Sequence, residues 1–175
     1  VVAALALTFD FTNGFHDAAN AIATSVSTRA LTPKVALAMA AVMNFAGALM
    51  GTAVAETIAH DIIHIDGVGT RLTLVAVLAA LVGAITWNLI TWWFGLPSSS
   101  THALIGGLVG AGLASGIAVY WDSIVEKVVL PMIFSPIIGF GIAFLVMVAV
   151  LWIFKNAAPA KASRRFRIAQ TASAA

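Results

Sequence analysis

Oxygen-bearing side chains recur at helical spacing in the first apolar segment of the chain. They are Asp10, Asn13, Asp17, Asn20 and Thr24. At about 100° per residue, these positions fall within one sector of roughly 80° on a continuous helix, and His16 lies beside that sector. Oxygen-rich stripes of this kind bind hard cations or relay protons. The structural alternative is hydrogen bonding that only holds neighbouring helices together.

Two features of this stretch favour a binding site. A carboxylate at membrane depth is costly unless it faces a cavity or a partner, so Asp17 is an expensive means of joining two helices. Gly14 lies near the centre of the stretch, where a helix can break and expose backbone groups to a ligand. We therefore expect a broken first helix that carries a site for a cation or a proton.

A second polar group lies in a short connection between two later apolar segments. Its residues are Gly95, Leu96, Pro97, Ser98, Ser99, Ser100, Thr101 and His102. Pro97 suits the start of a helix, and the hydroxyl side chains suit its N-cap. The free N–H groups of such a helix start, with four hydroxyls and an imidazole, would bind an anion. The alternative is an ordinary capped helix start.

The composition is that of an integral membrane protein. Of 175 residues, 61% are hydrophobic and 9% are charged, whereas about 25% of the residues in a soluble domain are charged. The absence of cysteine excludes disulfides, thiolate catalysis and cysteine-ligated metals. Basic residues concentrate near the C-terminal end, which indicates a cytoplasmic stop after a span and no nucleic-acid partner.

We expect an all-α integral membrane fold with about five hydrophobic segments. They lie at about residues 1–28, 34–58, 72–94, 98–120 and 129–154. Positive charges place the first loop and the C-terminal tail in the cytoplasm, and the second loop outside. An odd number of crossings then lies between residues 71 and 155. Three spans satisfy this, as does one span with a re-entrant hairpin tipped at Pro97–His102.

An odd number of crossings with polar motifs in mid-membrane is what one half of an inverted-repeat transporter would show. Residues 1–156 are predicted to form the transmembrane domain. Residues 157–175 are predicted to form a basic, flexible cytoplasmic linker or tail.

At the two polar segments the chain resembles the inorganic phosphate transporter (PiT) family. Residues 14–21 match the family signature G-x-N-D-x-A-N-A, with His16 replacing an asparagine, as in the bacterial low-affinity Pit-type branch. The second signature, G-L-P-x-S-x-T-H, matches residues 95–102. The family has two inverted repeats joined by a cytoplasmic linker, and the resemblance covers the first repeat only. It implies either a fragment or a half-size protein that must pair with a second copy.

The resemblance implies symport of inorganic phosphate across the cytoplasmic membrane, coupled to protons or sodium, and no enzymatic activity. It implies no cofactor, although bacterial relatives carry phosphate as a metal–phosphate complex, so a divalent metal is a candidate co-substrate. The residues expected to bind phosphate are Ser99, Ser100, Thr101, His102 and Asn20. Those expected to bind the coupling ion are Asp17, Asn13, Asp10 and His16. Asn44, where many eukaryotic relatives have a glutamate, and His16 together favour protons over sodium.

Several alternatives stay open at this point. The substrate could be sulfate or another oxyanion, or the chain could be a receptor or assembly module without transport activity. An intramembrane hydrolase could use Ser99 or Ser100 as its nucleophile and His102 as its base. Asn88 lies in mid-segment, where it either lines a cavity or joins helices. Glu56, His60 and His64 resemble a metal-ligand set only superficially, because they lie beside a polar loop.

Overall fold

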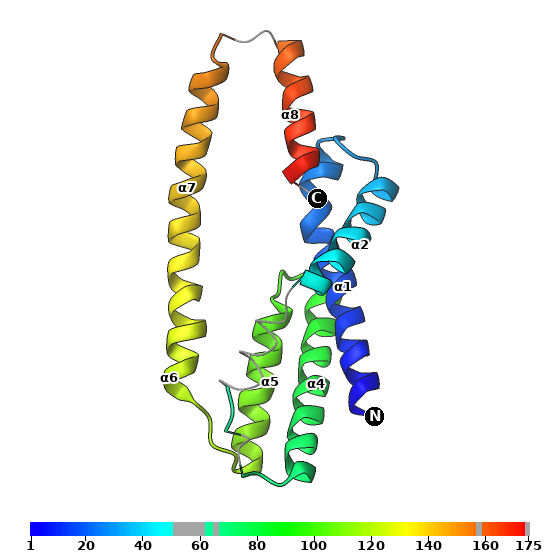
Figure 1. Cartoon of the computed structure of the whole chain (residues 1–175), viewed down its shortest axis with the longest axis vertical. Coiled ribbons are helices and arrows are strands. Elements are labelled where there is room, and N and C mark those ends of the chain that lie inside the picture. The colour runs from blue at the N-terminus through cyan, green and yellow to red at the C-terminus, as the bar shows by residue number, and fades with distance from the viewer. Residues whose placement is uncertain (51–61, 65–66, 157–158, 174–175) are drawn as a thin grey trace. The chain divides into compact units, whose positions relative to one another are not determined.

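The computed structural model describes residues 1–50, 62–64, 67–156 and 159–173. Within these ranges the chain is helical, apart from one isolated β-bridge between Ile63 and Val119. The elements are α1 (Val2–Ser27), α2 (Pro33–Met50), α4 (Thr70–Trp93), α5 (Ser100–Ser115), α6 (Trp121–Ile124), the π-helical turn η1 (Val125–Val129), α7 (Leu130–Phe154) and α8 (Pro159–Ser173) (Figure 1). The predicted all-α class is confirmed.

Two helical stretches have the length and apolar composition to cross a membrane. They are Thr70–Trp93, which is α4, and Trp121–Phe154, which runs from α6 through η1 to the end of α7. The apolar helix Pro33–Leu49 is shorter. Each of the five predicted apolar segments contains a helix, although residues 51–58 of the second lie outside the described residues. The number of membrane crossings stays a prediction.

The helix α1 is continuous from Val2 to Ser27, so the predicted break at Gly14 is wrong. One interior glycine costs a helix about 1 kcal/mol relative to alanine. A break would instead free several backbone hydrogen bonds, which is more costly in apolar surroundings. A methyl group at Gly14 would meet nothing within 4 Å, so no close contact requires glycine there. The oxygen-bearing residues of α1 therefore share one uninterrupted helix.

The described chain forms two compact units, and the first contains residues 1–20 and 48–124. In this unit α1 packs against α4 and α5 through an apolar cluster centred on Phe9, Leu81 and Ala84. Partly buried residues around the cluster include Ala103 and Leu104 of α5. The cluster fixes which faces of the three helices meet.

The helices α4 and α5 form a closely packed hairpin (Figure 1). Ala76, Ala80 and Ala84 recur every fourth residue on α4, and all three are buried. Opposite them, a Cβ atom on Gly107 would lie 2.5 Å from the carbonyl oxygen of Ala80. The two backbones therefore approach as closely as in small-residue interfaces of membrane helices, where van der Waals contact supplies the stability.

Backbone hydrogen bonds fix the end of α5. Gly116 ends the helix in the left-handed conformation, with φ of 71°, which glycine adopts without steric cost. The following chain then pairs with the segment that contains the β-bridge. His64 N–H donates to the carbonyl oxygen of Ala118 at 2.8 Å, and Tyr120 N–H donates to that of Ile62 at 3.1 Å. These bonds tie residues 62–64 to the end of the hairpin.

The second unit contains residues 21–47 and 125–175. Its α1–α2 cluster is built from Ile22, Ala36 and Ala40. Residues 159–173 of the predicted flexible tail form the helix α8. The Thr28 hydroxyl donates to Gln170 Oε1 at 3.0 Å, and this bond gives the helix a tertiary contact. The linker role and the cytoplasmic location of the tail stay predictions.

Candidate anion site at the α4–α5 turn

Ser99 caps the first turn of α5. Its backbone is extended, with φ of −102° and ψ of 115°, and its Oγ accepts the N–H of His102 at 3.3 Å. The same oxygen lies 2.7 Å from His102 Nδ1. A hydroxyl that donates its proton to Nδ1 can still accept the backbone N–H, so the two contacts are compatible. The predicted hydroxyl N-cap is confirmed, although the helix begins at Ser100 and not at Pro97.

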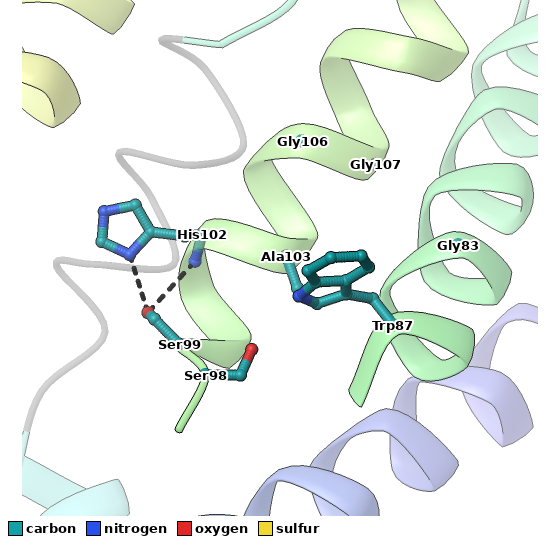
Figure 2. A pocket seen from close by; sticks show the side chains of 8 residues that line it. All are labelled: Gly83, Trp87, Ser98, Ser99, His102, Ala103, Gly106 and Gly107. Carbon is teal, nitrogen blue, oxygen red and sulfur yellow. Dashed lines mark hydrogen bonds between the residues drawn. The ribbon is translucent and has the colours of Figure 1, made fainter. Parts of the chain in front are cut away.

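A cavity of about 490 Å³ lies at this helix start. Its lining residues are Gly83 and Trp87 of α4 and Ser98, Ser99, His102, Ala103, Gly106 and Gly107 of the turn and α5. Figure 2 shows the three polar side chains at the beginning of α5 and Trp87 on the facing helix. Among the described residues, the lining contains hydroxyls and an imidazole but no carboxylate. With the positive end of the α5 dipole, this set suits an anion.

The four residues predicted at this end of the phosphate site divide into three environments. Ser99 and His102 line the cavity. Thr101 is exposed and does not line it. Ser100 is buried, with 4% of its surface exposed, and its Oγ has no hydrogen-bond partner. Successive residues of a helix point about 100° apart, so one run of hydroxyls cannot face a single cavity.

The predicted ion-binding residues of α1 do not line this cavity, which is formed by α4, α5 and their connection. Asp10 and Asn20 are exposed, whereas Asn13 and Asp17 are partly buried. Their grouping into an ion site, and the assignment of Asn20 to phosphate, stay predictions. His16 differs from them because it is buried, and its Nδ1 has no partner.

The described part of the chain contains no cluster of three or more histidine, cysteine, aspartate or glutamate residues that could hold a metal ion. Glu56 and His60 lie outside the described residues, so the weak metal-ligand set that contains them is not tested.

Two residues at or near the site were not singled out for it by the sequence. Trp87 forms one wall of the cavity. Asn88 has only 1% of its surface exposed, and neither polar atom of its amide has a hydrogen-bond partner. Leu81, Ala84, Asn88 and Thr91 follow the 3–4–3 spacing of a buried helix face. That spacing is the signal that could have indicated its burial.

Replacing Ser99 with alanine should lower the stability of the protein by about 1 kcal/mol, because the first turn of α5 loses its cap. Thermal unfolding in detergent would measure the change. Ser98→Ala is the matched control, since Ser98 lines the same cavity without capping the helix. Equal midpoints for the two variants would contradict the capping role.

The fold is that of an α-helical membrane protein, and a cavity lined by hydroxyls and an imidazole lies between two of its helices. The profile of the Phosphate transporter family matches residues 13–173. The chain belongs to this family, and the resemblance to the PiT family is confirmed.

Named relatives agree with this membership. A "Probable low-affinity inorganic phosphate transporter" of Streptomyces halstedii is 59% identical over an alignment of 176 positions, which covers 100% of this chain and 81% of the relative. One of Bacillus subtilis is 50% identical, over 97% of this chain and 51% of the relative. The "Low-affinity inorganic phosphate transporter PitA" of Escherichia coli is 40% identical, over 78% of this chain and 29% of the relative. The chain thus spans about half or less of the latter two.

A solved structure titled "The sodium-dependent phosphate transporter" matches with a TM-score of 0.84 and 32% identity. The match covers 93% of this chain and 41% of that one. The family and the named relatives are transporters and not enzymes, in agreement with the predicted absence of enzymatic activity. A membrane location follows from the family.

Proposed function

We propose that this chain takes part in secondary active transport of inorganic phosphate across the cytoplasmic membrane. The observation that carries the proposal is the hydroxyl- and imidazole-lined cavity at the start of α5, in a chain of the Phosphate transporter family. Phosphate presents oxygens in all directions, and N–H and O–H donors converge on this helix start.

In the proposed site, phosphate oxygens accept hydrogen bonds from the hydroxyls of Ser99 and Thr101, from His102, and from free N–H groups of the first turn. Ser99 has a single hydroxyl proton, so it donates to phosphate only when His102 Nδ1 is the donor in the 2.7 Å contact between them. The N–H of His102 already bonds to Ser99, so the free backbone donors are those of Ser100 and Thr101. Thr101 is exposed, and a rotation of its side chain about χ1 would bring its hydroxyl to the edge of the helix start. Ser100, through its backbone N–H and not its buried hydroxyl, and Asn20 complete the proposed set.

The proposed coupling ion, a proton or sodium, binds on α1 at Asp17 and Asn13, with Asp10 and His16 adjusting the local field. An anion beside a cation needs less desolvation than either ion alone, which gives coupling a physical basis. The proposed partners are phosphate, membrane lipid, and either a second repeat or a second copy of the chain. A divalent metal is a candidate co-substrate of phosphate. Movement of the two repeats around a midplane site would provide alternating access.

Replacing Thr101 with alanine should weaken phosphate binding about 10- to 150-fold, because a hydrogen bond to a charged group is worth about 1.5–3 kcal/mol. Equilibrium binding of radiolabelled phosphate to the purified protein would measure the change. Thr86→Ala is the matched control, because the exposed Thr86 hydroxyl bonds only to the carbonyl oxygen of Val82 in its own helix. Wild-type affinity in Thr101→Ala would contradict the assignment.

Competition by arsenate but not by sulfate would distinguish a phosphate transporter from a sulfate permease.

The 2.7 Å contact between Ser99 Oγ and His102 Nδ1 is also what a serine hydrolase requires. In the described residues, however, His102 has no hydrogen-bonded carboxylate to orient it. The transporter family weighs further against hydrolysis. Labelling of Ser99 by a serine-directed phosphonate, together with normal uptake by Ser99→Ala, would favour the hydrolase.

A further inference from the structure

Buried polar atoms without partners concentrate in the first compact unit. In the described chain these atoms are His16 Nδ1, Ser25 Oγ, Asn88 Nδ2 and Oδ1, and Ser100 Oγ. All except Ser25 Oγ belong to the first unit, where they come from three different helices. The exposed fractions of His16, Asn88 and Ser100 are 8%, 1% and 4%. A buried polar group without a partner costs free energy, above all in a membrane. We therefore expect a bound molecule or ion to supply partners for these atoms.

The three side chains continue the buried stripes that build the apolar cluster. His16 follows Phe9 by seven residues on α1, and Asn88 follows Leu81 by seven residues on α4. Ser100 precedes Leu104 by four residues on α5. Residues four or seven apart share one face of a helix. All three therefore face the junction of α1, α4 and α5.

Asn88 and Ser100 lie at similar heights along the bundle, and His16 lies about one helical turn from them. Gly107 lies against Ala80, and α5 runs antiparallel to α4 from there. Ser100 is seven residues from Gly107, and Asn88 is eight from Ala80, so both lie about 11 Å beyond that contact at 1.5 Å per residue. On α1, the ring of Phe15 lies 5.4 Å from that of Trp92, four residues after Asn88. His16 is therefore about one turn beyond Asn88.

We propose that His16, Asn88 and Ser100 enclose an internal hydration site, occupied by one water molecule or a short chain of them. The unpartnered atoms include both donors and acceptors, which is what water requires. A cation does not fit as well, because Asn88 Nδ2 would direct its N–H groups at it. None of the three residues lines the cavity at the start of α5, so the site is distinct from it.

The site has a consequence that rests on the proposed transport function. Ser100 belongs to the first turn of α5, next to the proposed phosphate ligands, and His16 is adjacent to Asp17. A shared water would join these two helix segments through Asn88, and Asn88 would act as a positioning residue for both halves of the transport site.

A high-resolution structure of the unmutated protein in lipid gives the direct test. We expect density for water within hydrogen-bond distance of the Asn88 amide and the Ser100 hydroxyl. A direct bond between these two side chains with no density between them would overturn the proposal. So would an ion at the shorter distances of about 2.3–2.6 Å typical of a bound hard cation. Phosphate is not needed, so the result is independent of whether the protein transports it.

A double-mutant cycle measures whether the groups share one occupant. Asn88→Leu and Ser100→Ala should each lower the midpoint of thermal unfolding in detergent by about 5 °C. The midpoint of the double variant should fall by much less than the sum of the two single shifts. Either change alone already displaces the shared water, so the second change has no further water to remove. Asn44→Leu is the matched control, since Asn44 is exposed and bonds to Ala40 in its own helix. Its shift in unfolding midpoint and that of Ser100→Ala should add in the double variant. Additive shifts for Asn88→Leu and Ser100→Ala as well would contradict a shared site.

Discussion

Replacing Asp17 with asparagine should reduce gradient-driven phosphate uptake more than about 100-fold. The variant removes one negative charge from the face of α1 and keeps the size of the side chain. Attraction between a carboxylate and a cation about 4 Å away is worth about 4 kcal/mol at an effective dielectric constant of 20. Asparagine supplies only a dipole, so most of that attraction is lost. Radiolabelled phosphate uptake into proteoliposomes, under an imposed proton or sodium gradient, would measure the effect.

The matched control is Asp122→Asn, which removes the same charge from an exposed position on α6. Its uptake should equal that of the unmutated protein. Both variants should be assayed in this chain and in any longer polypeptide that contains it. Normal uptake by Asp17→Asn would rule out Asp17 as the coupling-ion ligand. Absence of uptake by every unmutated protein, at verified insertion, would refute phosphate as the substrate, and sulfate would be tested next.

Replacing Gly107 with alanine should destabilise the α4–α5 hairpin. The added methyl would lie 2.5 Å from the Ala80 oxygen and 3.1 Å from its Cα, and both atoms belong to the backbone. The helices would have to separate, and overpacking of this kind costs about 1–3 kcal/mol. In a protein of this size, each kcal/mol of lost unfolding free energy lowers the unfolding midpoint by about 2–4 °C. Thermal unfolding in detergent should therefore resolve the loss. Phosphate binding should weaken too, because Gly107 lines the cavity.

Gly110→Ala is the control on the same helix, because a methyl there would meet nothing within 4 Å. Alanine favours a helix over glycine by about 1 kcal/mol, so this variant should be as stable as the unmutated protein or more so. If Gly107→Ala were equally stable, the close approach of the two backbones would be refuted.

Sequence periodicity predicted the elements better than their contacts. The hydroxyl cap at Ser99 could be predicted because capping depends on residues that are neighbours in sequence. The continuity of α1 through Gly14 could not, because a break depends on whether a ligand or a neighbouring helix compensates the freed backbone groups. The contact of Gly107 with Ala80 was also missed, since small residues do not identify the helix they will meet.

The site shows the same limit. The run from Ser98 to His102 was predicted to bind an anion, and this stays a prediction. The sequence did not indicate that Ser100 would face the interior while Ser99 faces the cavity. That division depends on the residue at which the helix begins. An error of one residue in that start turns the direction of every side chain by about 100° around the helix axis. The sequence left open whether Asn88 lines a cavity or joins helices, because its burial results from the packing of α1 and α5 against α4.

The continuity of α1 also bears on how membrane voltage would act during transport. A broken helix would contribute partial charges from the ends of its two halves. In an unbroken α1 the backbone groups around Asp17 are bonded within the helix. The fixed charge at the two proposed ligands Asp17 and Asn13 is therefore that of one carboxylate, and Asp10 lies seven residues away. In the proposed cycle an empty site carries that single negative charge, and its passage across the full field is worth about 2.3 kcal/mol per 100 mV. One bound proton or sodium ion cancels it. Any net current per phosphate is then set by the charge of phosphate itself and by the cations that accompany it beyond the first.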